Sequence, residues 1–362
     1  MRVLQLIQKP QLRGAEIFAC QLSEELACYG VTSDVAFLFG EENNVLNFNL
    51  KFHALGAIQQ RRFSDFSGYK NLAELVRSGQ YEIVQANAGD TLKYAIISKL
   101  LYRWRTPVVF RNANKMSDFI KNPYQKWFNK WLLGKCRFVV SVSENCRQDI
   151  LTIIPSLKNR SITIPIGTKS FELVEPIARP NPDEPFFVSI GSLVPEKNHV
   201  FLIDVFHEFI KGGNKGHLWI IGEGHLRAML EDRIQALGLN DRIKLPGAKN
   251  NVLSYLKASD ALMMPSLIEG LPGVILEALS CRIPVISASV GGIPEVINED
   301  TGQLIRNSEI SAYLKAMEDI IQNSSGNKWR NRVIAGERLV REHYTMPIVT
   351  HSFFQTYRRI ID

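Results

Sequence analysis

The stretch ALMMPSLIEGLPGVILEA, residues 261–278, decides the fold that the sequence predicts. It opens with a short apolar run typical of a buried strand, then passes through a loop rich in glycine and proline into a second apolar run with helical spacing. The same pattern, a buried strand that ends in a turn before a helix, recurs at FFVSIG, LWIIG, RIKLPG and IPVISA. Strands that alternate with crossover helices form a parallel sheet. We therefore expect a doubly wound α/β domain in the second half of the chain.

The first half shows the same alternation, and the length of the whole chain, 362 residues, suits two domains. We place the linker in TKSFELVEPIARPNPDEP, residues 168–185, because its four prolines prevent a long regular element. The predicted division is 1–170, 171–346, and a last helix over 347–362 that starts at Pro347 and could cross back to the first domain. In the first half we expect strands near 2–7, 32–39, 82–86, 107–111, 137–142 and 162–166, and helices near 15–29, 90–103 and 117–134.

Composition excludes several classes of protein. Hydrophobic residues make up 45% of the chain and charged residues 22%, which is typical of a globular protein and not of a disordered one. No apolar run reaches the length of a spanning helix, and the start is a poor secretory signal. The five scattered cysteines include no CxxC pair, which favours a reducing cytoplasm over a disulfide or zinc framework.

Two glutamates, Glu269 and Glu277, stand eight residues apart around the Gly-Leu-Pro-Gly turn. In open α/β sheets, ligands bind where strands end and helices present free amides, and a diphosphate suits those amides. The two carboxylates could then accept hydrogen bonds from hydroxyl groups on either side of it. An acidic residue near a helix start is also commonly a solvated charge or one that stabilises the helix dipole. The surrounding motifs decide between this interpretation and a ligand-binding role.

Three further turns support a phosphate site. In GSLVPEKN, Ser192 leaves a strand and Lys197 precedes a helix, where a lysine can neutralise a phosphate or be an ordinary surface charge. Gly14, beside Arg13 in RGAE, could offer its amide to a phosphate or form a plain turn. We interpret the glycines of IIGEG as the packing of a tight turn, because the third glycine of a dinucleotide fingerprint is missing.

Together these motifs resemble glycosyltransferase family 4, whose GT-B architecture has two facing Rossmann-like domains with a deep cleft between them. The most specific part is the E-x7-E pair, Glu269 and Glu277; GSLVPEKN, IIGEG and RGAE follow the expected order. The resemblance implies that Glu269 contacts the donor sugar, Glu277 the ribose hydroxyls and Lys197 the diphosphate, with Glu269 and Lys197 as the catalytic pair. Donor-binding residues implied with them are Gly14, Ser192, Gly247, Gly270, Leu271, Pro272, Gly273 and Val274.

Three positions depart from the family pattern. Ser192 stands where the family often has arginine, and Arg13 precedes Gly14 where many members have Gly-Gly. FRNANKM replaces a segment that often carries histidine, so we assign a polar role on the acceptor side to Asn112 or Asn114.

The first half is basic, with 22 Lys and Arg against 13 Asp and Glu in residues 1–168, whereas the remainder has 21 against 23. Between Arg103 and Arg137 the only acid is Asp118, and aromatic residues recur there at spacings of three and four. This pattern predicts either a core helix with a solvated face or a basic amphipathic helix at an anionic membrane. Nucleic acid is ranked low because no recognised module is present. The residues assigned to the acceptor or membrane side are Arg13, Asn112, Asn114, Lys115, Lys126, Trp127, Lys130 and Trp131.

The predicted function is that of a retaining glycosyltransferase for a hexosyl or N-acetylhexosaminyl group. It would use a nucleotide sugar, with UDP as the expected nucleotide, and build a cell-surface polysaccharide or lipid-linked glycan at the cytoplasmic face of the membrane. No Asp-x-Asp motif occurs, so we expect no metal and no other cofactor, with Lys197 and helix amides as the counter-charge. Two alternatives stay open: a nucleotide-sugar epimerase of the same fold, and a catalytically silent sugar-nucleotide binder.

Overall fold

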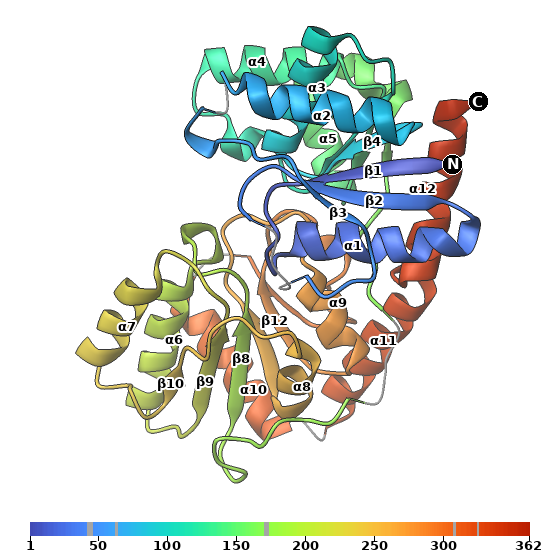
Figure 1. Ribbon diagram of the computed structural model, residues 1–362. Helices are drawn as coiled ribbons and strands as arrows, with labels where there is room; N and C mark the ends of the chain where they lie inside the picture. The colour runs from blue at the N-terminus through green and yellow to red at the C-terminus, as the bar shows by residue number, and fades with distance from the viewer. Residues whose placement is uncertain (42–45, 62–63, 170–173, 307–308, 324–325) are drawn as a thin grey trace. The chain divides into compact units, whose positions relative to one another are not determined.

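The computed structural model describes residues 1–41, 46–61, 64–169, 174–306, 309–323 and 326–362. It divides into two compact units (Figure 1). Unit 1 consists of Met1–Gly167 and Met346–Asp362, and unit 2 of Thr168–Thr345. Within the described ranges, no helix has both the length and the apolar content needed to cross a membrane.

Unit 1 is built on a parallel sheet that has seven strands over its described residues. Its core-facing residues alternate along each strand with residues on the other face, as a sheet covered on both sides requires. The spatial order is β3 (Phe52–Ala54), β2 (Thr32–Phe37), β1 (Arg2–Ile7), β4 (Ile83–Ala86), β5 (Val108–Asn112), β6 (Phe138–Ser141) and β7 (Ser161–Thr163).

Helices cover both faces of this sheet. One face carries the larger apolar core, formed with α2 (Phe66–Gly79), α3 (Gly89–Tyr102), α4 (Pro123–Gly134) and α5 (Glu144–Ile153). The other carries α1 (Gly14–Leu26) and α12 (Met346–Ile361), which lie side by side. Short 3₁₀ turns are η1 (Ala27–Tyr29), η2 (Gln59–Arg61), η3 (Ser117–Phe119) and η4 (Pro155–Arg160).

The last helix, α12, belongs to unit 1 although it follows unit 2 in the sequence. Phe353 packs on Phe18 of α1 with ring centroids 5.8 Å apart. The buried hydroxyl of Tyr357 donates to Oε1 of Gln85 at 2.6 Å, and Nε2 of Gln5 lies 3.4 Å from the same hydroxyl. These contacts tie α12 to strands β1 and β4.

Local sequence sets several helix starts in unit 1. Asp65 accepts the amide of Gly68 at 3.0 Å and caps α2, and Ser143 accepts the amide of Cys146 at 3.2 Å and caps α5. Pro123 is the first residue of α4, behind an Asn122 cap. The expected helix over 117–134 is therefore shorter, because Pro123 starts it and residues 117–119 form η3.

Unit 2 holds a second parallel sheet, of six strands over the residues described. In spatial order they are β10 (Ile243–Lys244), β9 (His217–Ile221), β8 (Phe186–Ile190), β11 (Ala261–Met264), β12 (Val285–Ala288) and β13 (Gln303–Ile305). Its helices are α6 (His199–Lys211), α7 (Arg227–Ala236), α8 (Val252–Ala258), α9 (Gly273–Ser280), α10 (Ile310–Asn323) and α11 (Asn327–His343), with the turns η5 (Pro195–Lys197) and η6 (Ile293–Glu295).

The order of these strands positions the predicted donor residues. Strands β8 and β11 are neighbours, and Leu262 of β11 pairs with Val188 of β8. Since both strands run in the same direction, the loops that follow them leave the sheet at the same edge. Lys197 lies in the loop after β8, and Glu269 in the loop after β11.

Candidate donor site in unit 2

The loops after β8 and β11 are joined by their backbones. The amide of Leu267 donates to the carbonyl of Glu196 at 2.8 Å. Nδ2 of Asn198 donates to the carbonyl of Pro265 at 3.3 Å. These bonds hold the end of η5, which carries Lys197, beside the loop that carries Glu269. The backbone of the two loops therefore brings the two charged side chains together.

Lys197 and Glu269 form an ion pair in which Nζ of the lysine donates to Oε1 of the glutamate. The side chain of Glu269 is 8% exposed and that of Lys197 is 22% exposed. A charge pair this sheltered is screened less than a surface pair. A nucleotide diphosphate reaching this place would meet a lysine already held in position.

The start of α9 lies next to this ion pair in the chain. Among the described residues, no carbonyl accepts a hydrogen bond from the amides of Gly270, Leu271, Gly273 or Val274. Pro272, the residue before the helix, has no amide to donate. Four free amides at a helix start form a binding place for an anion, here beside a lysine.

Glu277 lies on α9 and is partly buried. Burial raises the pKa of its carboxyl group to about 7. Burial is the only influence on this carboxyl group, and no described residue donates a hydrogen bond to it or pairs with it, so its hydrogen-bonding capacity is free for a ligand hydroxyl. Without a hydrogen-bond donor, burial makes the ionised form of Glu277 unfavourable.

Glycines allow the loops at this edge to approach one another closely. A side chain at Gly222 would overlap the carbonyl of Gly191, and one at Gly224 would overlap the carbonyl of Leu193. The IIGEG turn is therefore a backbone packing element, as its sequence predicted. Gly247 also belongs to this region, because its carbonyl accepts the amide of Gly222 at 3.1 Å.

Two features of the site were missed in the sequence. After β12, Gly291 has φ +57° and the amide of Gly292 donates to the carbonyl of Gly270 at 2.5 Å, which holds the donor loop from its other side. The consecutive glycines of ISASVGG were the available signal.

The second feature is His199, which begins α6 and is 2% exposed. Burial, with Lys197 as a lesser cause, lowers its pKa to about 4. Its Nδ1 has no hydrogen-bond partner among the described residues.

The remaining predicted donor residues are less enclosed. Ser192 is partly exposed and its carbonyl accepts the amide of Val194 at 2.9 Å. Gly14 belongs to unit 1, where it is exposed at the first position of α1, and a Cβ there would meet no atom within 4 Å. No group of three or more His, Cys, Asp or Glu within the described ranges is arranged to hold a metal ion.

The predicted acceptor-side residues lie in unit 1 and differ in their surroundings. Asn112 is 3% exposed, and its Nδ2 donates to the carbonyl of Cys146 at 3.2 Å, so the amide ties β5 to α5. Trp131 packs against the apolar core beside Phe128, so it is not a free surface aromatic. The other predicted residues are more accessible: Asn114 and Lys115 are partly buried, and the exposed ones are Arg13, Lys126, Trp127 and Lys130.

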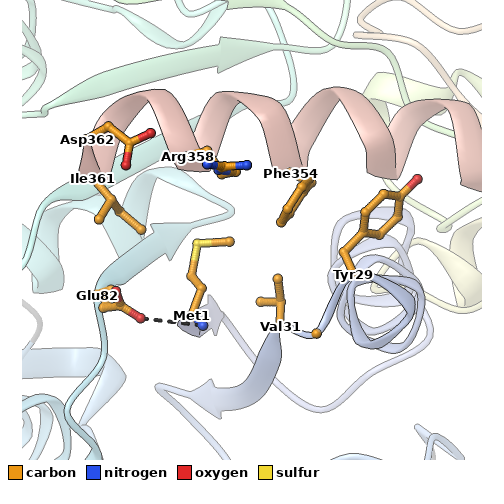
Figure 2. Close-up of a pocket in the computed structure, with 9 residues that line it drawn as sticks. Met1, Tyr29, Val31, Glu82, Phe354, Arg358, Ile361 and Asp362 are labelled. Carbon is orange, nitrogen blue, oxygen red and sulfur yellow. Dashed lines mark ion pairs between the residues drawn. The ribbon is translucent and has the colours of Figure 1, made fainter.

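A pocket of about 260 Å³ lies elsewhere in unit 1 (Figure 2). Its lining includes Met1 and Val31, which precede β1 and β2, and Arg358 near the end of α12. The amine of Met1 pairs with Glu82 at 3.7 Å. This pocket is at the amino ends of the strands, opposite to the edge where parallel sheets bind ligands, so we assign the candidate site to the loops described above.

Comparisons with known proteins bear on the fold and the family of the chain. Residues 171–338 match the model of the family described as glycosyl transferases group 1. The chain is 26% identical over 301 residues to an Escherichia coli UDP-Gal:alpha-D-GlcNAc-diphosphoundecaprenol alpha-1,3-galactosyltransferase, covering 76% of this chain and 77% of that enzyme. It is 31% identical over 137 residues to the capsular polysaccharide biosynthesis glycosyltransferase CapH of Staphylococcus aureus, covering 37% of this chain and only 34% of CapH.

A solved structure shows the same fold. Anabaena Alr3699/HepE, in complex with UDP-glucose, superposes with a TM-score of 0.83 at 16% identity, covering 99% of this chain and 100% of that one. The α/β fold class and the GT-B architecture of two Rossmann-like units are confirmed. Unit 2 therefore resembles the glycosyl transferases group 1 over almost its whole length.

Proposed function

We propose that this glycosyltransferase moves a hexosyl or N-acetylhexosaminyl group from a UDP-sugar to a glycan or lipid-linked acceptor in cell-surface polysaccharide synthesis, with retention of anomeric configuration. One observation carries the proposal: the Lys197–Glu269 ion pair lies beside the free amides that start α9, in the unit that matches the family. The names of the E. coli and S. aureus relatives support the substrate class.

The proposed chemistry follows from charge. Breaking the anomeric bond leaves negative charge on the diphosphate, and preorganised donors stabilise that charge most effectively. Lys197 and the amides of Gly270, Leu271, Gly273 and Val274 would supply them without a metal ion. The acceptor hydroxyl would attack from the leaving-group face and pass its proton to the leaving phosphate. Glu269 would then orient the donor sugar and Lys197, and Glu277 would accept hydrogen bonds from the ribose.

The test is the substitution Glu269→Gln, which keeps the size of the side chain and removes its charge. We expect sugar transfer to fall at least about 100-fold, the loss found when one preorganised polar contact is removed from an active site. The matched control is Glu231→Gln, at an exposed position on α7 whose carboxylate pairs with Arg227. Unchanged transfer by Glu269→Gln would contradict the assignment, and so would an equal loss in the control.

Incubation of the wild-type protein with a UDP-sugar alone separates the remaining possibilities. A transferase needs an acceptor other than water for rapid turnover, whereas an epimerase converts the UDP-sugar without one. A silent binder would be stabilised by UDP but release no sugar under any condition. Conversion of the donor to its epimer would overturn the proposal.

We also propose that unit 1 attaches peripherally to an anionic membrane surface at the cytoplasmic face. The exposed side of α4 carries Tyr124 and Trp127, which are 71% and 60% exposed. Their rings lie 6.0 Å apart, and the exposed Lys126 and Lys130 are on the same helix. Aromatic and basic side chains together suit the headgroup region of a bilayer.

A further inference from the structure

Arg111, near the end of β5 in unit 1, is a buried cation without hydrogen-bond acceptors. It is 3% exposed, and its Nε and Nη1 have no partner among the described residues. Its guanidinium carbon lies 4.1 Å from the centroid of the Phe18 ring in α1. A ring face offsets part of the cost of burying a cation, but it does not satisfy the guanidinium N–H groups.

The polar neighbours of Arg111 on the same face of the sheet already bond to one another. Nε2 of Gln85 donates to Oδ1 of Asn87 at 3.0 Å, and Nδ2 of Asn87 donates to Oε1 of Gln5 at 3.0 Å. The hydroxyl of Tyr357 donates to Oε1 of Gln85. The guanidinium therefore stands beside side chains that bond to one another, and none of them accepts a hydrogen bond from its Nε or Nη1.

The other side of Arg111 faces the first turns of α1. Glu16 is 4% exposed, accepts Nε2 of Gln11 at 3.0 Å, and interacts electrostatically with both Arg13 and Arg111. Burial raises the pKa of the Glu16 carboxyl group, which weakens it as a counter-ion. Arg13 and Gly14, at the start of the helix, are exposed. Two arginines thus flank a helix start that is open on one side, where an anion is favoured.

We propose that Arg111 and the first turn of α1 bind a phosphate or diphosphate group of the acceptor. The inference rests on the proposed function and narrows its acceptor to an anionic one. A phosphate oxygen supplies the acceptors that Arg111 lacks, in the bidentate geometry that guanidinium groups prefer. Arg13 adds charge at the entrance, and the amides of Gly14 and Ala15, which donate to no carbonyl of a described residue, add hydrogen bonds. In this proposal Gly14 serves the acceptor and not the donor. Arg111 is in this account a specificity-determining residue for the acceptor.

The experiment measures binding by calorimetry in protein saturated with UDP, so that the donor site is filled. The probes are farnesyl diphosphate, inorganic pyrophosphate and farnesol. For Arg111→Gln we expect about 10- to 100-fold weaker binding of farnesyl diphosphate, as for the loss of a charged hydrogen bond. Arg111→Lys should keep part of the affinity. Arg137→Gln, which changes an exposed arginine just before β6, should keep all of it.

The three probes identify the group that is recognised. If the phosphates are the ligand, pyrophosphate shows the same dependence on Arg111 as farnesyl diphosphate, and farnesol shows none. Wild-type affinity of Arg111→Gln for both phosphate probes would overturn the inference, as would an equal loss of farnesol binding.

A second measurement covers the case in which Arg111→Gln does not fold. In the wild-type protein, farnesyl diphosphate should slow hydrogen exchange at the amides of Gly14 and Ala15, and farnesol should not; equal exchange with both probes would overturn the inference. Failure of the proposed function has a different signature, because wild-type protein would then neither bind UDP nor turn over a UDP-sugar. UDP binding with diphosphate binding that is independent of Arg111 refutes only this acceptor site.

Discussion

Glu277 shows how the environment of one residue changes its chemistry. A glutamate in water titrates near 4.5, but burial on α9 raises the pKa of this carboxyl group to about 7. Between these pH values the folded state holds a proton that the unfolded state has released. The free energy of unfolding therefore falls as the pH rises from about 4.5 to about 7, and stays lower above that range. The shift corresponds to about 3 kcal/mol.

Replacing Glu277 with glutamine should reverse this effect. The neutral amide cannot ionise, so the Glu277→Gln variant should be more stable than the wild type at pH 8, by up to about 3 kcal/mol, and similar to it near pH 4.5. Urea unfolding at several pH values measures the difference. A stability difference that does not depend on pH would contradict the raised pKa.

UDP binding should also depend on the protonation of Glu277, but it should become stronger as the pH rises, whereas the stability of the fold becomes lower. Ribose hydroxyls donate to the ionised carboxylate and so favour it, which lowers the pKa of Glu277 in the complex. UDP affinity of the wild type should therefore increase from pH 6 to pH 8. The Glu277→Gln variant should bind more weakly and lose most of that increase, which titration calorimetry can follow.

At the level of elements, the donor site depends on loops that touch backbone to backbone. Gly291 follows β12 with φ +57°, and a side chain there would overlap the carbonyl of Glu269. The next residue, Gly292, donates its amide to Gly270. Any displacement of this turn therefore moves the loop that carries Glu269 and the first amides of α9.

The substitution Gly291→Ala should damage both stability and activity. Gly238→Ala is a matched control, because Gly238 also has a positive φ of +67° but a Cβ there meets no atom within 4 Å. The left-handed conformation alone costs roughly 1–2 kcal/mol for alanine. Gly291→Ala should cost clearly more than Gly238→Ala in thermal unfolding, and only Gly291→Ala should lose sugar transfer. Equal effects would show that the contact with Glu269 has no role.

The elements themselves could be largely predicted from the sequence, because the strands are short apolar runs and the turns carry glycine and proline. The sequence could not show that α4 begins only at Pro123, since its apolar spacing continues upstream through Phe119 and Ile120. The hydrogen-bond partners of individual side chains were harder to predict. Asn112 or Asn114 is assigned to the acceptor side because FRNANKM stands where the family often has histidine, and the sequence could not show that the amide of Asn112 bonds to the carbonyl of Cys146. Arg111, one residue earlier, lacks such a partner.

On the scale of the whole molecule, the two halves of the chain carry different chemistry. The family model covers residues 171–338, and the predicted donor residues other than Gly14 lie in unit 2. The excess of basic residues, the exposed aromatic side chains of α4 and the buried Arg111 lie in unit 1. A donor half with a general nucleotide-sugar site and a basic half suited to an anionic acceptor would explain why the charge is so uneven.

This division predicts where a membrane would act on the molecule. Lys126→Glu with Lys130→Glu should weaken binding to vesicles containing anionic lipid by at least about 30-fold, since each basic residue near such a surface contributes about 1 kcal/mol. Lys211→Glu with Lys215→Glu changes the net charge equally but in unit 2, and should have little effect.

Trp127→Ala should weaken vesicle binding at low and high salt alike, because the contribution of the tryptophan is apolar. The contribution of the lysines should decrease at high salt, because salt screens their charge. Flotation of each variant with anionic and neutral vesicles gives the comparison. If the unit 2 pair reduced binding as strongly as the α4 pair, net charge and not this helix face would be responsible, and the attachment of unit 1 would have to be abandoned.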